Sequence, residues 1–497
     1  MSEGIKKYGG ILLKGSFAVS LANSTTKFVS FLLIPIFTYY LSPEDYGTVA
    51  MVTIVVTFLN LFYNPGMVSA TMRLYHDTDN EEERKELIGS AHRFFLFFPI
   101  IFIITGLIFG EFIFEKAFND FKFYPFGLIA LILAFFGQPK RIWVTLMTLQ
   151  YKVHITAIYS AISVIVGILT TAFLVIVLEM GAMGKVLGMF PSVIIFFFLS
   201  FTTIRKYAGN LWSFASIKKQ LKFGFPLIIA IWSYEFLHLA DRYILERMTN
   251  LKDVGIYSFG YHLAELPMFL VLGVKQLWNP IFYENMNKGD FKTISKLINY
   301  FVAFLTLINI GVLLFSKEAI VLFINPRYFD AIPVIGVIIV GVYFNGLLTI
   351  SNSILAYKKK FGTTSKIALI ATVICIVLNI LLIPTTGIMG SAIATMISYF
   401  IYFVLGLWHQ RETIAQLQAK ALTIVPITCV VLVMLINLSF NHTFKNEFNW
   451  TELILKIIIF VAVCFTFYQF KLLGKEEVVY LKAIIKSKIL KKKKTNL

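Results

Sequence analysis

The chain has 497 residues, of which 58% are hydrophobic and only 14% are charged. Soluble domains are nearly half apolar and about a quarter charged, so this composition excludes an ordinary soluble protein and is typical of an integral membrane protein. The formal net charge of +18 would also suit nucleic-acid binding, so the distribution of the charge has to decide between the two.

Hydrophobic runs of about 20 residues, the length that crosses a roughly 30 Å hydrocarbon core, recur along the whole chain with short polar gaps. They predict an all-α integral membrane protein of about fourteen transmembrane helices, with no room for a soluble domain. The first run is too long for the apolar part of a signal peptide and is expected to remain as the first helix. The predicted spans are 15–40, 46–68, 94–110, 125–149, 153–178, 183–203, 223–246, 255–277, 297–316, 330–356, 366–384, 387–408, 421–440 and 452–470.

The positive charge lies mainly on one side of the predicted membrane. If the N-terminus is cytoplasmic, about 33 of the 45 Lys and Arg residues fall on that side and about 9 on the other, which is the asymmetry of the positive-inside rule. Both termini are therefore predicted to be cytoplasmic. Clusters such as Lys218, Lys219 and Lys222 are expected to touch anionic lipid headgroups, and no nucleic-acid partner is expected.

Motifs for catalysis and metal binding are missing from the sequence. The three cysteines, Cys375, Cys429 and Cys464, fall in predicted helices without metal-ligand or disulfide spacing,. The sequence contains no Walker A, G-x-S-x-G or H-E-x-x-H motif and no Rossmann fingerprint in a suitable context. We therefore expect neither an enzyme nor a metal or organic cofactor, and any transport is passive, ion-coupled or driven by consumption of the product.

An internal repeat divides the chain into two similar parts. The matching segments are separated by about 206 to 208 residues, as expected for transporters built from two related halves. They are Asp45-Tyr46-Gly47 with Asp253-Val254-Gly255, and Gly181-Ala182-Met183-Gly184 with Gly387-Ile388-Met389-Gly390. Six spans per part predict two parallel lobes, although an accidental match of common membrane residues is the alternative.

The repeat sets the predicted domains. Residues 1–210 form the N-terminal lobe with helices one to six, and residues 211–410 form the C-terminal lobe with helices seven to twelve. Residues 411–470 add a helix pair whose role the sequence does not indicate, and residues 471–497 form a basic cytoplasmic tail. Segment 213–222 alternates apolar and basic positions, which predicts a helix in the membrane interface, with a solvated linker as the alternative.

Charged and polar residues at membrane depth are the candidate site residues, because a charge there is costly and mostly faces a protein interior or a watery cavity. One lies in the first predicted helix, one in the fourth, four in the seventh and two in the eighth. They are Lys27, Arg141, Glu235, His238, Asp241, Arg242, Glu265 and Lys275.

The seventh predicted helix carries most of these candidates. Positions 235, 238 and 242 share one face of a helix. Under the repeat, Lys27 corresponds to Glu235, so a cation and a carboxylate would stand at equivalent places across a cavity. For Asp241 and Arg242, near the outer end of the helix, the alternative is structural pairing with neighbouring loops or lipid headgroups, and for His238 it is a hydrogen bond inside the bundle.

Three segments resemble, in the same order, motifs of the bacterial polysaccharide biosynthesis proteins, the Wzx-type oligosaccharide flippases. They are LLIPIFTYYLSPEDYG at 32–47, DRYIL at 241–245 followed by VGIYS at 254–258, and LNILLIP at 378–384 followed by GIMGSA at 387–392. The resemblance implies the MATE-like fold of the multidrug, oligosaccharidyl-lipid and polysaccharide exporter superfamily, with two six-helix lobes around a central cavity.

The resemblance also implies a substrate, which is an oligosaccharide on undecaprenyl diphosphate. It would be moved from the cytoplasmic to the outer leaflet of a bacterial inner membrane for O-antigen, capsule or exopolysaccharide synthesis, with glycosyltransferases and a polymerase as partners. Lys27, Lys275 and Arg141 would suit the diphosphate. The carboxylates Glu235, Asp241 and Glu265 would repel it, unless they bind sugar hydroxyls or a coupling H⁺ or Na⁺.

The sequence is compatible with two alternatives. The first is a cation-coupled multidrug exporter of the same superfamily, which would prefer an acidic and apolar cavity. The second is a membrane glycosyltransferase or polymerase acting on lipid-linked sugars. Such an enzyme would need catalytic residues in sizeable outer loops, and the longest outer loops, 111–125 and 316–330, lack a convincing acid pair.

Overall fold

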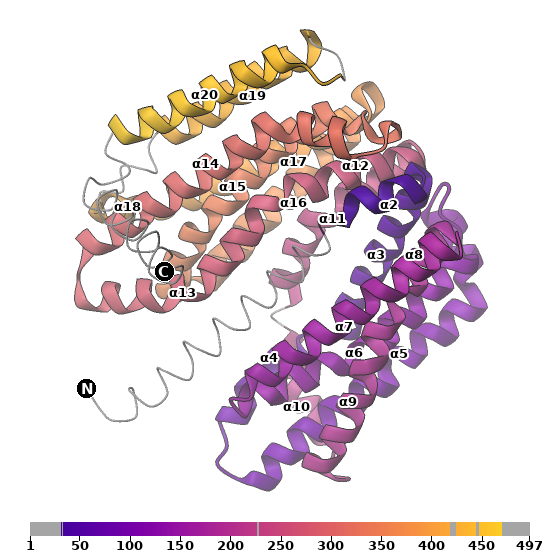
Figure 1. Cartoon of the computed structure of the whole chain (residues 1–497). Coiled ribbons are helices and arrows are strands. Elements are labelled where there is room, and N and C mark those ends of the chain that lie inside the picture. The colour runs from indigo at the N-terminus through magenta and orange to yellow at the C-terminus, as the bar shows by residue number, and fades with distance from the viewer. Residues whose placement is uncertain (1–30, 32, 226–227, 418–423, 444–446, 470–497) are drawn as a thin grey trace, which may run out of the picture.

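The computed structural model of the chain describes residues 31, 33–225, 228–417, 424–443 and 447–469. In these ranges the chain forms helices and no strand, and 10 helices are long and apolar enough to cross a membrane. Figure 1 shows two helical bundles with a further helix pair along one side. The predicted all-α membrane architecture of two lobes and an added C-terminal pair is confirmed. Each predicted span from the second to the last coincides with one helix or two consecutive helices, and the first lies mostly outside the described residues.

The N-terminal bundle begins with a strong helix signal. The side chains of Ser42 and Asp45 each accept the other residue's backbone N–H, at 3.1 and 2.9 Å, which forms a capping box at the start of α3,. Gly66, with φ 72°, makes the left-handed turn into α4,. The elements are α2 (Ile34–Tyr40), α3 (Pro43–Tyr63), α4 (Met67–His76), α5 (Glu81–Ala117), η1 (Phe123–Gly127), α6 (Leu128–Leu149), α7 (Val153–Ala172), η2 (Phe173–Val177), α8 (Gly181–Leu187) and α9 (Phe190–Ala208).

The C-terminal bundle is built around α15, a continuous apolar helix that the other helices cover on almost every side. Asn250 caps α12 by accepting the N–H of Asp253 at 2.9 Å,. The elements are α11 (Ile228–Met248), α12 (Leu251–Ala264), α13 (Leu266–Lys288), α14 (Phe291–Phe323), η4 (Pro326–Tyr328), α15 (Ala331–Tyr357), α16 (Phe361–Thr386), α17 (Ile388–Trp408) and α18 (Arg411–Leu417).

Several predicted spans differ from the helices observed, and two of them show the physical reason. The span 255–277 is broken at Glu265, where α12 ends and α13 begins, because Pro267 has no N–H for the helical hydrogen-bond ladder,. The span 94–110 is only the apolar middle of α5, which has 37 residues and begins with three glutamates. Glutamates suit the first turn of a helix electrostatically, so the helix starts well before its apolar part.

Helix α10 (Phe214–Gly224) is present where the interface helix 213–222 is predicted. Its Gln220 accepts a hydrogen bond from the hydroxyl of Thr71 at 2.6 Å and donates one to the carbonyl of Leu87 at 3.2 Å. Lys219 forms an ion pair with Glu83 at 3.1 Å. The helix therefore packs on α4 and α5 of the N-terminal bundle. The domain boundaries at 210, 410 and 470 stay predictions.

The added pair, α19 (Ile424–Thr443) and α20 (Trp450–Gln469), packs on α14. Four buried charges join α20 to α14. Lys317 and Glu452 are 2.6 Å apart, and Lys456 lies 2.7 Å from both Glu452 and Glu318. We call these four residues the α14–α20 network. Its two cations and two carboxylates neutralise one another, so the pair is attached to the C-terminal bundle by a closed polar contact.

The two bundles converge at one face of the molecule and diverge toward the opposite one (Figure 1). We call the first the closed face; it contains the beginnings of α3 and α12, which pack against each other. A Cβ on Gly47 would clash with the carbonyl oxygen of Leu251, and one on Gly255 with that of Pro43. The two glycines of the repeated sequence motif thus allow the backbones of the two lobes to touch. In the predicted orientation the closed face is the outer one.

Candidate functional site

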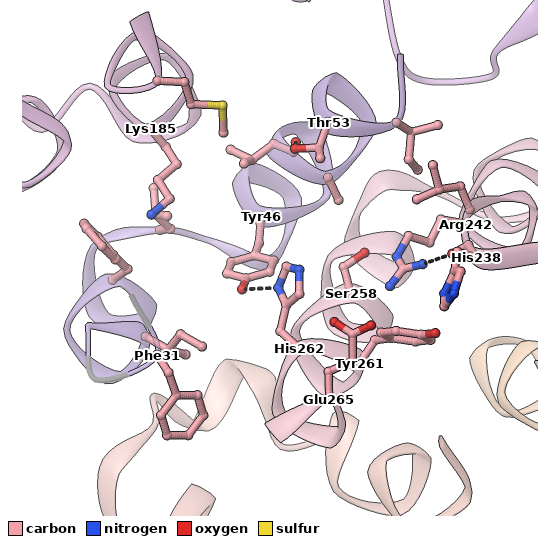
Figure 2. A pocket seen from close by; sticks show the side chains of 18 of the residues that line it. Phe31, Tyr46, Thr53, Lys185, His238, Arg242, Ser258, Tyr261, His262 and Glu265 are labelled. Carbon is pink, nitrogen blue, oxygen red and sulfur yellow. Dashed lines mark hydrogen bonds between the residues drawn. The ribbon is translucent and has the colours of Figure 1, made fainter. Parts of the chain in front are cut away.

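A cavity of about 610 Å³ lies between the two bundles, next to the closed face. Both lobes contribute to it: α2, α3, α7 and α8 from the N-terminal bundle, and α11 and α12 from the C-terminal one. Figure 2 shows side chains of this lining, with Lys185 and Arg242 on different sides. Its polar lining consists of Tyr46, Thr53, Lys185, His238, Arg242, Ser258, Tyr261, His262 and Glu265.

Arg242 is the cation on the C-terminal side of the cavity. It lies one helical turn after His238 on α11, and its Nη1 donates to the backbone carbonyl of His238 at 2.8 Å and to Asp241 Oδ1 at 3.2 Å. The guanidinium carbon is 4.1 Å from the ring centre of Tyr261, a cation–π contact. These contacts hold the guanidinium in one place at the wall of the cavity.

Asp241 lies behind this wall and is fully buried. Its Oδ2 accepts hydrogen bonds from the hydroxyls of Tyr257 at 2.7 Å and Thr395 at 3.3 Å. The hydroxyl of Tyr399 lies 2.7 Å from Nδ1 of His238. A buried carboxylate is tolerated only when its oxygens have partners, and here α11, α12 and α17 together supply them.

Lys185 on α8 is the cation on the N-terminal side. Its Nζ lies 3.7 Å from the ring centre of Phe37, and no carboxylate pairs with it among the residues that the structure describes. It also reaches a second cavity of about 340 Å³ between α7 and α8. The lysine follows the repeated Gly-Ala-Met-Gly motif directly and corresponds to the buried Ser391 in the other lobe. Its place directly after the repeated motif, at the edge of a predicted span, was the signal that could have identified it.

Tyr46 and His262 connect the lobes inside the cavity. The hydroxyl of Tyr46 on α3 is 2.9 Å from Nδ1 of His262 on α12 (Figure 2). Glu265 lies one turn further on, at the break between α12 and α13. Sequence reasoning did not select Tyr46, because a tyrosine near a helix start is common at membrane interfaces.

The candidate residues from the sequence fall into several places. His238, Arg242 and Glu265 line the cavity, and Asp241 lies behind it. Arg141 on α6 and Glu235 on α11 are half-buried, do not line the cavity, and are close enough across the lobes for their charges to interact. Lys27 lies outside the described residues, and so does the side chain of Lys275, whose backbone is part of α13.

Among the residues that the structure describes, the lining combines two cations, aromatic walls and one carboxylate. Such a surface suits an anionic group together with sugar rings, since cations bind phosphate oxygens and aromatic faces pack against the apolar faces of sugars. In the described part of the chain, no three His, Cys, Asp or Glu side chains are grouped as a metal ion would require.

Comparison with known proteins gives a family. Residues 12–286, more than half of the chain, match the family described as polysaccharide biosynthesis protein. The putative O-antigen transporter of Shigella flexneri is 22% identical over 74% of this chain and 90% of its own. The succinoglycan biosynthesis transport protein ExoT of Rhizobium meliloti is 22% identical over 69% of this chain and 68% of its own. An uncharacterized membrane protein of Methanocaldococcus jannaschii, MJ1068, is 26% identical, but the match spans only 40% of its length.

Solved structures agree with this fold. The lipid II flippase MurJ in an inward closed conformation has a TM-score of 0.70, with 18% identity over 92% of this chain and 98% of its own. A MATE family transporter of the MOP superfamily, inward-facing, has a TM-score of 0.66, with 14% identity over 81% and 99%. The chain therefore has the fold of these two proteins and is a multi-pass membrane protein, and it belongs to the polysaccharide biosynthesis protein family.

Proposed function

We propose that the protein moves an oligosaccharide linked to undecaprenyl diphosphate from the cytoplasmic to the outer leaflet of a bacterial inner membrane by alternating access. The observation that carries the proposal is Lys185, a cation in the cavity without a carboxylate partner in the described chain. Lys185 is half-buried; a cation partly removed from water is stabilised by a counter-ion, and a diphosphate bound in the cavity would supply one. The names of the O-antigen and succinoglycan relatives support a glycan cargo.

The remaining lining fits the other parts of such a substrate. Arg242 is held in place by Asp241 and Tyr261 and presents its guanidinium at the wall opposite Lys185. The rings of Tyr46 and Tyr261 offer faces for sugars,. The polyprenyl tail would stay in the lipid. Because the glycan changes leaflet in this step, the enzymes that build it would act before the step on the cytoplasmic leaflet, and those that polymerise it would act afterwards on the outer leaflet.

We also propose that a cation gradient of H⁺ or Na⁺ drives the cycle, with Asp241 as the carboxylate that binds the ion. Asp241 is fully buried, and the hydroxyls of Tyr257 and Thr395 lie within reach of its Oδ2. Carboxylate and hydroxyl oxygens suit a hard cation. Export of glycan should therefore stop when the corresponding ion gradient is collapsed, and Asp241→Asn should remove that dependence together with most of the export.

Lys185→Met tests the substrate. In cells that lack their own exporter, surface glycan made with the variant should fall roughly tenfold or more, since a charge-assisted contact to phosphate is lost. Lys116→Met is the matched control, because it removes an exposed lysine at the end of α5, away from the cavity. Normal export by Lys185→Met at equal expression would overturn the diphosphate assignment. Efflux of cationic dyes in place of glycan export would indicate the multidrug alternative.

A further inference from the structure

A carboxylate that sequence reasoning did not select joins the two lobes at the closed face. Glu246, near the end of α11, accepts three hydrogen bonds on its Oε1 from consecutive backbone N–H groups of the loop between α5 and η1. The donors are Asn119 at 2.8 Å, Asp120 at 2.8 Å and Phe121 at 3.0 Å. Because α11 belongs to the C-terminal bundle and the loop to the N-terminal one, these bonds cross the lobe boundary.

The charge of Glu246 depends on this loop. The side chain is fully buried, and within the described part of the chain it forms no ion pair. Its second oxygen, Oε2, is buried without a hydrogen-bond partner among the described residues. Successive N–H groups that converge on one oxygen form an anion-binding nest, and bonds to a charged acceptor are stronger than neutral ones. The loop is therefore the group that stabilises the buried carboxylate.

Neighbouring contacts reinforce the same junction. The amide of Asn119 donates to the carbonyl of Thr249 just after α11, at 3.3 Å. The rings of Phe118 and Tyr243 meet edge to face at 5.7 Å, which is a favourable aromatic geometry. All of these contacts have one partner on each lobe, so they break together when the lobes separate at this face.

A half-open junction is unfavourable for a physical reason. With the lobes in contact, Glu246 has its three donors; with the lobes apart, water reaches the carboxylate and hydrates it. A partly separated junction would leave a buried charge without partners, which is strongly unfavourable. The backbone contact of Gly47 with Leu251 lies at the same face and must also open, but it buries no charge and therefore carries no such all-or-none requirement.

We propose that Glu246 and the N–H groups of residues 119–121 form a latch that holds the transporter closed at this face. The latch rests on the alternating access of the proposed function, and it makes Glu246 a positioning residue: the side chain touches no substrate and sets how often the closed face opens. Releasing the latch shifts the population toward the state that is open at this face, even when no substrate is present.

The test measures the distance across the closed face. Spin labels at Glu179 and Arg327, both exposed and located on different lobes, report lobe separation by pulsed electron resonance in the purified full-length protein. The background replaces the three native cysteines with alanine. In Glu246→Ala, the ratio of long to short distances should rise roughly tenfold over the parent, the factor that a net 1.4 kcal/mol would give. Glu246→Gln keeps the shape and one acceptor oxygen and should give a smaller shift in the same direction.

Glu115→Ala is the matched control, because it removes an exposed carboxylate from the end of α5 without touching the loop contacts. An unchanged distance distribution in both Glu246 variants would overturn the latch. If Glu246→Ala does not fold, the glutamine variant decides alone. The distance measurement uses no glycan, so it tests the latch separately from the substrate. If the distances change as expected but the protein exports no glycan, the latch is supported and the proposed substrate is rejected.

Discussion

Lysine side chains lie inside the protein in two regions, fully buried in one and half-buried at the wall of a cavity in the other, and the two regions differ in the partners that they offer. In the α14–α20 network, Lys317 and Lys456 lie 2.6 to 2.7 Å from the carboxylates of Glu452 and Glu318. In the cavity, Lys185 has an aromatic ring beside its ammonium group and no carboxylate partner in the described chain. The charges of the first group neutralise one another, whereas the charge of Lys185 requires a counter-ion from outside the described chain.

The difference separates a structural charge from a binding one. A buried charge that has all its partners stabilises one arrangement of helices, and its removal leaves the remaining partners unsatisfied. A cation in a cavity without a counter-ion is unfavourable for folding alone, and such charges at membrane depth typically mark substrate or ion pathways. Substitutions in the two regions should therefore have opposite effects on stability and on export.

The largest effect is expected in the α14–α20 network. Glu452→Ala leaves Lys317 and Lys456 buried with one carboxylate between them, and it should lower the free energy of unfolding by about 3–5 kcal/mol. The measurement is thermal unfolding in lipid nanodiscs. A matched variant with Lys317→Met, Glu318→Gln, Glu452→Gln and Lys456→Met removes all four charges together and should recover most of that loss. If Glu452→Ala melts like the parent, the network does not hold α20 on α14.

Lys185→Met should show most clearly that the cavity and the α14–α20 network differ in their effects on stability and on export. Because the lysine has no ion-pair partner in the described chain, its removal should change the free energy of unfolding by less than about 1 kcal/mol or increase it. In the same variant, the amount of exported glycan should fall roughly tenfold or more. Thermal unfolding of purified protein, set beside export in cells, checks both. A loss of stability comparable to that of Glu452→Ala would show that Lys185 is a structural charge.

Most of the fold could be predicted from the sequence because a bilayer imposes helix length. Runs of about 20 apolar residues leave few alternatives to spanning helices, so the spans from the second to the last coincide with helices. The errors lie where apolarity is not the determining factor. The break at Glu265 depends on Pro267, and α5 extends past its apolar middle because glutamates favour a helix start,.

The cavity was harder to predict, because facing partners come from distant parts of the chain. The face of α11 with His238 and Arg242 follows from helical spacing, and both residues line the cavity. Lys185 is at the edge of a predicted span, where a lysine usually faces headgroups. Glu246 is likewise near a helix end, and only the folded structure brings the loop at 119–121 to it. The spacing of residues along the sequence does not show which distant segments come into contact in the folded protein.

Asp241→Asn removes a charged partner at the wall of the cavity, so its effect on stability can be compared with that of Glu452→Ala in the α14–α20 network. It weakens the ion pair with Arg242, but Arg242 keeps the carbonyl of His238 and borders the cavity, where water can hydrate it. The loss of unfolding free energy should therefore be about 1–2 kcal/mol, below that of Glu452→Ala. Thermal unfolding of the purified variant measures this loss, and Asp79→Asn, which alters an exposed carboxylate, is the control. A loss as large as that of Glu452→Ala would place the Asp241 and Arg242 pair among the structural charges.

The smallest effect is expected for Tyr46→Phe, which removes the hydrogen bond between the lobes to His262. His262 is exposed at the cavity, so water replaces the lost partner and the net loss is about 0.5–1.5 kcal/mol. Because the bond joins the lobes and not helices of one lobe, the loss should appear in the distance distribution between Glu179 and Arg327 and leave the melting temperature unchanged. Tyr39→Phe, which alters an exposed hydroxyl on α2, is the control. A lower melting temperature with unchanged lobe distances would mean that this contact stabilises the bundle like the α14–α20 network and does not oppose lobe separation.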